Sequence, residues 1–245
     1  MEVSEKIVFI KNWILNYVNS MSNRAKSLVI GISGGIDSSV TSTLCAMTGI
    51  KTIVLTMPIK QIRSQHDLSL KHEKWLKNKF NNIESHTIEL DEVFKSFNLK
   101  LSNFKSEHGL ANSRARVRMT TLYQVAAAKN GIVVGTGNKI EDFGIGFYTK
   151  YGDGGVDISP IADCTKTEIW ELGRELEILE EIVQAQPTDG LWDDGRTDVG
   201  QLGLTYQELE DAMNNSNSPH RSKYLEKRKL NLHKMQPIPV CKIPK

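Results

Sequence analysis

Residues 33–39 read Ser-Gly-Gly-Ile-Asp-Ser-Ser and combine the glycines and hydroxyls of an anion-binding loop. They follow an apolar run at 28–32 and precede a helix-like stretch at 40–47. A strand, a glycine turn and a helix N-terminus in this order form a binding site for phosphate. Asp37 would repel a phosphate unless a cation such as Mg²⁺ lay between them. Because the loop also lacks the lysine of a Walker A sequence, it favours Mg-pyrophosphate chemistry. A helix-capping turn without a ligand is the alternative.

A second glycine-containing loop follows the apolar run at 131–135. It reads Gly-Thr-Gly-Asn over residues 135–138 and is followed by Glu141. Thr136 can hydrogen-bond a nucleotide, and Glu141 could share a magnesium ion with Asp37, since Mg²⁺ commonly takes one or two carboxylates plus phosphate and water oxygens. Taken alone, this motif is better explained by a glycine turn beside a surface glutamate.

Two groups of basic residues lie on predicted helices. Arg114 and Arg118 share one helical face, whereas Arg116 points nearly opposite to them. Lys166 follows Thr165 in a Thr-x-x-Glu capping box, so we expect it in the first turn of a helix. A lysine there opposes the helix dipole, and a bound triphosphate would offset that cost. A solvated basic face is the alternative for the arginines.

The elements that position these residues alternate between strands and helices. This alternation predicts an α/β fold with a doubly wound parallel sheet, followed from about residue 150 by a helical C-terminal extension. Ligands bind such sheets at the carboxyl ends of the strands, so the loops at 33–39 and 135–138 should open on the same edge. The predicted helices span 5–20, 36–48, 66–80, 111–129, 165–179, 206–213 and 218–233, and the predicted strands span 27–32, 52–57, 85–90 and 131–135.

Composition narrows the classes of protein. A net charge of +2 is weak for a dedicated nucleic-acid binder, so we expect no nucleic-acid partner. The three cysteines are far apart and form neither a disulfide framework nor a CxxC site. No signal peptide or membrane-spanning apolar run is present, which predicts a cytoplasmic protein without a membrane partner. We expect residues 1–245 to form a single domain.

Two segments carry a family resemblance. The loop SGGIDSS resembles the signature of the N-type ATP pyrophosphatases, and the longer stretch GTGNKIEDFGIGFYTKYGDGGVD resembles the segment that marks NAD synthetases. The resemblance implies an adenine nucleotide alpha hydrolase-like fold. It also implies amidation of deamido-NAD to NAD through an adenylated nicotinate carboxylate, with ATP as co-substrate and Mg²⁺ as cofactor.

The resemblance also implies roles for individual residues. Asp37 and Lys166 are the implied catalytic residues, and Asp37 and Glu141 are the implied metal ligands. The implied ATP-binding residues are Gly31, Ile32, Ser33, Gly34, Gly35, Ile36, Asp37, Ser38, Ser39, Thr136, Lys166 and Thr188. The implied deamido-NAD-binding residues are Arg116, Lys150, Asp157, His233 and Lys234.

The resemblance further bears on the nitrogen source and on assembly. Glutamine-using members carry a separate glutaminase domain, and no such domain or Cys-centred amidase motif is expected here. Ammonia is therefore the predicted nitrogen donor, and the family is typically a homodimer. Two alternatives remain open: another ATP pyrophosphatase, such as a GMP synthetase subunit or a tRNA-modifying enzyme, and a non-catalytic nucleotide sensor on a similar fold.

Overall fold

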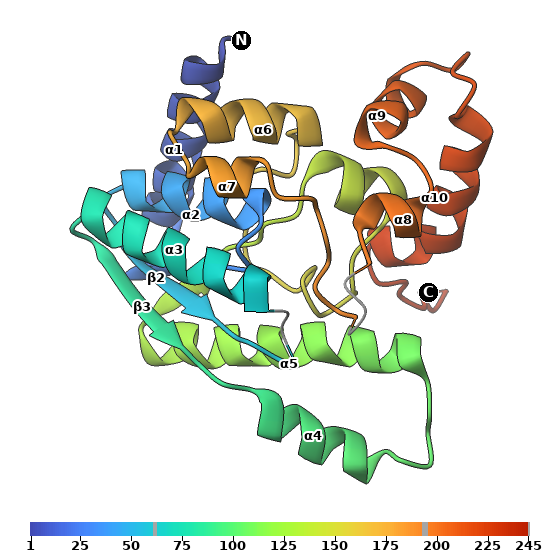
Figure 1. The fold of residues 1–245 in the computed structure, drawn as a ribbon, viewed down its shortest axis with the longest axis horizontal. Helices are drawn as coiled ribbons and strands as arrows, with labels where there is room; N and C mark the ends of the chain where they lie inside the picture. The colour runs from blue at the N-terminus through green and yellow to red at the C-terminus, as the bar shows by residue number, and fades with distance from the viewer. Residues whose placement is uncertain (61–62, 193–195, 245) are drawn as a thin grey trace.

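The computed structural model describes residues 1–60, 63–192 and 196–244. A four-stranded parallel sheet in the order β3-β2-β1-β4 lies at its centre (Figure 1). The strands are β1 (Ser27–Gly31), β2 (Lys51–Thr56), β3 (Ile83–Thr87) and β4 (Gly131–Val133). The α helices are α1 (Val3–Ser20), α2 (Ile36–Met47), α3 (Arg63–Lys79), α4 (Asp91–Lys100), α5 (Glu107–Ala128), α6 (Lys166–Glu175), α7 (Glu180–Val183), α8 (Asp198–Leu202), α9 (Tyr206–Asn214) and α10 (Arg221–Met235), and the π-helix η1 spans Lys139–Ile145.

Side-chain alternation along the strands builds a core on each face of the sheet. Leu28 and Ile30 of β1 point to the face covered by α1, α2 and α6, whereas Val29 points to the face covered by α4 and α5. All three side chains are buried. Strands buried on both faces read as continuous apolar runs, which is why the sequence identified β1 and β2 without ambiguity.

A separate apolar cluster holds the C-terminal helices to the π-helix. Ile140 and Ile145 of η1 pack with Leu209 and Tyr224 from α9 and α10. Figure 1 shows these helices gathered at one side of the sheet. The helical extension predicted beyond residue 150 is therefore confirmed. Its helices α9 and α10 pack against η1 and hold it in place.

Most predicted elements occur with shifted ends, and others were not predicted. The third strand ends at Thr87 rather than at residue 90, and the helix predicted over 165–179 ends at Glu175, because Glu177 adopts a left-handed φ of 59°. The unpredicted elements are α4, η1 and the short helices α7 and α8. None of the helices in the described part of the chain combines the length and apolar character needed to cross a membrane.

The N-terminal helix occurs where it was predicted and is amphipathic. Ile10, Ile14 and Val18 form its buried apolar face, whereas Tyr17 is 38% exposed and stacks on Trp13. The spacing of the buried residues centres that face away from Tyr17. The helix therefore buries aliphatic side chains and leaves aromatic ones accessible.

Candidate nucleotide and metal site

The loop between β1 and α2 is held open by its own hydroxyls. The Ser38 Oγ accepts from the Ser33 amide at 3.2 Å and donates to the Gly35 carbonyl at 3.1 Å, while the Ser39 Oγ donates to the same carbonyl at 2.9 Å. Gly35 is the N-cap of α2, and no side-chain hydrogen bond caps this helix start. The first-turn amides of a twelve-residue helix are thus turned toward the loop, the arrangement that binds phosphate oxygens.

Gly34 lets the loop approach helix α3. Its φ is +87°, and a Cβ built there would lie 2.6 Å from the Gln65 carbonyl oxygen and 2.9 Å from the Ser69 amide nitrogen. Both atoms belong to the backbone, so a side chain at this position would require α3 to move. The glycine is therefore needed for conformation and for space.

This dual requirement gives a matched pair of variants. Gly34→Ala should lower the free energy of unfolding by about 2–5 kcal/mol, the sum of left-handed strain and overpacking. Gly49→Ala should cost only about 1–2 kcal/mol, because Gly49 has a similar φ of +76° but no atom within 4 Å of its Cβ position. Urea denaturation of both variants measures the difference; equal losses would show that the close approach to α3 carries no energy.

The second loop meets the first because β4 pairs with β1. Asn138 is fully buried and caps η1, its Oδ1 accepting from the amides of Ile140 and Glu141 at 3.1 and 3.0 Å. Its Nδ2 donates to the Asp37 Oδ1 at 2.9 Å. One amide side chain therefore fixes both loops, and the prediction that they open on the same edge is confirmed.

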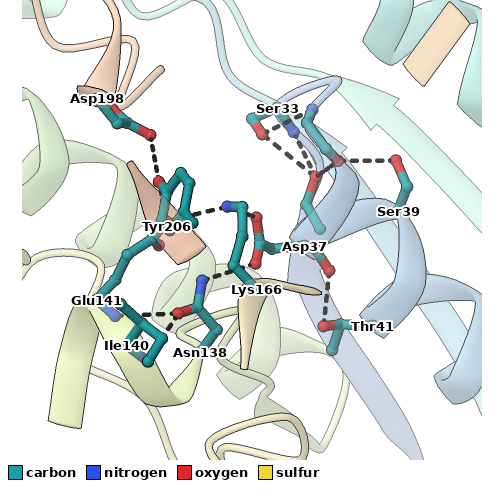
Figure 2. Close-up of polar contacts among 12 residues, drawn as sticks. Ser33, Asp37, Ser39, Thr41, Asn138, Ile140, Glu141, Lys166, Asp198 and Tyr206 are labelled. Atoms are coloured by element: carbon teal, nitrogen blue, oxygen red, sulfur yellow. Dashed lines mark hydrogen bonds and ion pairs between the residues drawn. The ribbon is translucent and has the colours of Figure 1, made fainter. Parts of the chain in front are cut away.

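Lys166 joins the two carboxylates that the sequence singled out. Its Nζ lies 2.6 Å from the Asp37 Oδ2 and 2.9 Å from the Glu141 Oε1, and its side chain is only 2% exposed (Figure 2). The predicted capping box is present, with the Thr165 hydroxyl accepting from the Glu168 amide. This cap starts α6 so that its first residue points between Asp37 and Glu141.

Lys166, Asp37 and Glu141 form a buried ion triad, in which burial raises the pKa of Asp37 above its ordinary value although the charge of Lys166 opposes that shift. Burial alone would lower the pKa of Lys166, but the Asp37 and Glu141 carboxylates outweigh it and raise that pKa above its ordinary value. Burial would raise the pKa of Glu141, but Lys166 and the Tyr206 hydroxyl, which donates to the Glu141 Oε1 at 2.5 Å, lower it. The lysine is therefore cationic and Glu141 is ionised.

One cavity of about 290 Å³ unites most of the predicted nucleotide residues. Thr188 reaches it from the segment after α7 and accepts a hydrogen bond from the Gln65 Nε2 at 3.0 Å. Ser39 does not line the cavity but lies behind the loop, fully buried. The predicted residues that line it are Gly31, Ile32, Ser33, Gly34, Gly35, Ile36, Asp37, Ser38, Thr136, Glu141, Lys166 and Thr188.

The five residues predicted to bind deamido-NAD do not line this cavity. The Arg116 Nε donates to the Lys150 carbonyl at 3.3 Å. The Asp157 carboxylate accepts from the Val133 amide at 2.7 Å and from the Tyr123 hydroxyl at 3.1 Å, so it ties the 150s loop to β4.

The two C-terminal members of that set differ from each other. The Lys234 Nζ donates to the Tyr148 carbonyl at 2.7 Å and lies over the Tyr148 ring, whereas His233 is exposed. Neither contact brings the pair to the nucleotide cavity. The roles of these five residues therefore stay predictions.

The structure adds one cation to the cavity that sequence reasoning did not assign. Arg118 lines the cavity, and its Nε donates to the Met57 carbonyl at 3.0 Å. Burial and the neighbouring charge of Arg114 lower the pKa of Arg118 to about 10. The shared face of Arg114 and Arg118 was the available signal, and the buried position of Arg114 and exposed position of Arg116 confirm the predicted helical phase.

The sequence model for NAD synthase matches residues 6–241. The chain belongs to the NAD synthase family. A curated relative, the NH(3)-dependent NAD(+) synthetase of Carboxydothermus hydrogenoformans, is 37% identical over 85% of this chain and 83% of its own length. The sequence predicted the NAD synthetase family in preference to the other ATP pyrophosphatases, and this prediction is confirmed.

Solved structures of NAD synthase relatives share the fold. The NMN synthetase of Francisella tularensis superposes with a TM-score of 0.90 at 31% identity, covering 99% of this chain and all of that one. The NH3-dependent NAD synthetase of Campylobacter jejuni has a TM-score of 0.79 at 25% identity, covering 99% of this chain and all of that one. The predicted doubly wound α/β fold is confirmed.

Proposed function

We propose that the chain catalyses the ATP-dependent amidation of deamido-NAD to NAD with ammonia. The nicotinate carboxylate attacks the α-phosphorus of ATP to form an acyl-adenylate and pyrophosphate, and ammonia then displaces AMP. The observation that carries the proposal is the convergence of Asp37, Glu141 and Lys166 on the uncapped start of α2. Family membership and the names of the curated relatives support the reaction class and the donor.

The residues at this position fit a magnesium ion bound together with a polyphosphate. Within the described residues, no group of three or more His, Cys, Asp or Glu side chains is arranged to hold a metal. The two carboxylates of Asp37 and Glu141 already surround a cationic nitrogen, and Mg²⁺ completes its shell with phosphate and water oxygens. We propose these two residues as its ligands; when bound, the ion would neutralise charge on the departing pyrophosphate.

The chain's own groups have separate tasks in this reaction. The α2 amides and the loop hydroxyls would hold the phosphates, and Arg118 adds positive charge at the cavity wall. As the nucleotide enters, the Lys166 ammonium would move from the carboxylates of Asp37 and Glu141 to the negatively charged phosphates. None of these steps needs a side-chain nucleophile, and burial raises the pKa of Cys45 to about 12.

The decisive assay measures NAD, AMP and pyrophosphate formed from Mg-ATP and deamido-NAD, with ammonium compared against glutamine. Stoichiometric products with ammonium, and little with glutamine, establish the reaction. Binding of ATP without turnover of any carboxylate would replace it with a nucleotide-sensing role.

A second candidate substrate is the corresponding mononucleotide carboxylate, which would give NMN in place of NAD. The specific observation in its favour is the TM-score of 0.90 with the Francisella tularensis NMN synthetase over the full length of both chains. The two substrates differ by an adenylate group, so the comparison of their kcat/KM values under identical ammonium and Mg-ATP decides between them. A higher kcat/KM for the mononucleotide would make it the assigned substrate and would leave the proposed amidation reaction unchanged.

Arg116 provides a test of the predicted dinucleotide contacts. Arg116→Ala should raise the KM for deamido-NAD by at least about tenfold, the loss of one charge-assisted contact, and leave the KM for ATP nearly unchanged. Steady-state kinetics with each substrate varied in turn measures both constants. Lys100→Ala, at the C-terminal end of α4, is the control for a general loss of surface charge. A larger effect on ATP would place Arg116 elsewhere in the reaction.

We also propose a homodimer in the cytoplasm. The exposed aromatic stripe of α1 formed by Phe9, Trp13 and Tyr17 is one surface that a second copy could cover, and sedimentation equilibrium of the purified chain tests the assembly. The three cysteines are free thiols, in keeping with a reducing compartment.

A further inference from the structure

Asp198 is a buried acid at the edge of the nucleotide cavity with no role in the scheme above. It is the first residue of α8, is 4% exposed and lines the same cavity as Asp37 and Lys166. Its Oδ1 is buried without a hydrogen-bond partner in the described structure, and its Oδ2 lies 3.1 Å from the Tyr206 hydroxyl. Figure 2 shows Tyr206 standing between Asp198 and Glu141.

Counting hydrogens fixes the protonation of this chain of groups. The Tyr206 hydroxyl has one proton and two acidic neighbours, at 2.5 Å from the Glu141 Oε1 and 3.1 Å from the Asp198 Oδ2. Glu141 is ionised beside Lys166, and a charged acceptor takes the shorter and stronger bond. The tyrosine proton therefore points to Glu141, and the second contact is favourable only when Asp198 supplies its own proton.

We propose that Asp198 is a positioning residue that keeps a proton at rest and, by donating it to Tyr206, holds Glu141 against Lys166. The inference deepens the proposed function, because Glu141 is there assigned to the metal. The relay runs from α8 through α9 to η1, so it couples the segment after residue 195 to the ion triad.

The surroundings of Asp198 agree with a neutral carboxyl. Burial, then the negative charge of Glu141 on η1, raise the pKa of Asp198 to about 7. Asp189, in the segment before α8, acts in the same direction, whereas Lys166 on α6 opposes it, as the Tyr206 hydroxyl on α9 would if it donated to Asp198.

These groups fix the sign of the pH effect. The stabilising contribution of neutral Asp198 is fully present below the ordinary pKa of 3.8 and is lost as pH rises through about 7. Above that pH the ionised Asp198 carboxylate faces the Tyr206 oxygen without a proton between them, because the tyrosine proton is donated to Glu141.

Two variants of Asp198 distinguish the effect of its hydrogen-bond donor from the effect of its ionisation. Asp198→Asn keeps a donor for Tyr206 and cannot ionise, so its kcat should stay within about threefold of the wild type near pH 6.5, while Asp198→Ala should lose roughly 10–100-fold. The fall in kcat of the wild type above pH 7 should be absent in Asp198→Asn. Asp163→Asn, which changes a carboxylate that is 97% exposed, is the control.

Two readouts do not depend on turnover. The infrared difference spectrum of the wild type minus Asp198→Asn should contain a protonated-carboxyl band at pH 6 that is lost at pH 9; burial also raises the pKa of Asp142 and Asp153, so only the difference between the two proteins reports on Asp198. Thermal unfolding should show the wild type losing stability between pH 5 and pH 8 relative to Asp198→Asn. Equal loss of kcat in the Asn and Ala variants, or an unchanged infrared band in Asp198→Asn, would overturn the inference. An inactive wild type with the expected band would instead count against the proposed function alone.

Discussion

Replacing Lys166 by alanine is expected to lower the free energy of unfolding by about 3–5 kcal/mol at pH 7, since removal of one partner leaves uncompensated buried charge. The two carboxylates that contact its Nζ are each less than a fifth exposed, so water can compensate for the lost ammonium only in part. Chemical denaturation followed by circular dichroism measures the change. Lys166→Met, which restores the volume but not the charge, should be nearly as unstable.

The pH dependence of that loss has a definite sign. Without the ammonium of Lys166, burial should raise the pKa of both acids in the variant above the ordinary carboxyl range, so they bind protons as pH falls from 7 toward 4 and the difference from the wild type should shrink. Lys139→Ala is the matched control, because the Lys139 ion pair with Asp163 is at the surface and should contribute at most about 1 kcal/mol. A Lys166 variant no less stable than the Lys139 variant would mean that the triad adds nothing to the fold.

Asp37→Asn and Glu141→Gln are each expected to reduce pyrophosphate release by at least about 100-fold while the chain stays folded. Either amide keeps the shape of the site and leaves Lys166 one carboxylate partner, so the loss should fall on the chemistry. Pyrophosphate release and the binding of Mn²⁺ in the presence of ATP are the two measurements, with Asp163→Asn as the control.

Weakened Mn²⁺ binding in both amide variants would support the assignment of Asp37 and Glu141 as metal ligands. Near-normal turnover in both variants would refute it. Loss of turnover with unchanged Mn²⁺ binding would instead assign the two carboxylates to the positioning of Lys166.

The sequence was sufficient for the parts of the site that have a local signal. Apolar runs located β1 and β4, the glycines located both loops, and the capping box located the start of α6. The strand and loop signals place Asp37 and Glu141 at one sheet edge, whereas the assignment of Lys166 to the same site came from the family resemblance. Asn138, at the N-cap of η1, also has a residue type that favours a helix start, although the predicted elements included no helix there.

Other parts depended on contacts between distant segments. Helix α4 buries only Phe94, too little to give an apolar period, and a π-helix such as η1 has no established sequence period. Tyr206 reaches Glu141 across 65 positions, and no spacing rule connects them. The residues predicted for deamido-NAD came from resemblance, and none of them lines the nucleotide cavity.

The long chain separations within the ion triad set the order in which the molecule can assemble. Asp37 and Lys166 are 129 positions apart, and the hydrogen bond between Asp37 and Asn138 closes 101 positions. During synthesis from the N-terminus, β1, β2 and β3 can pair well before Lys166 has left the ribosome. Asp37 must therefore remain hydrated and without its lysine partner through much of chain elongation, so the charged centre is completed late and the sheet serves as its template.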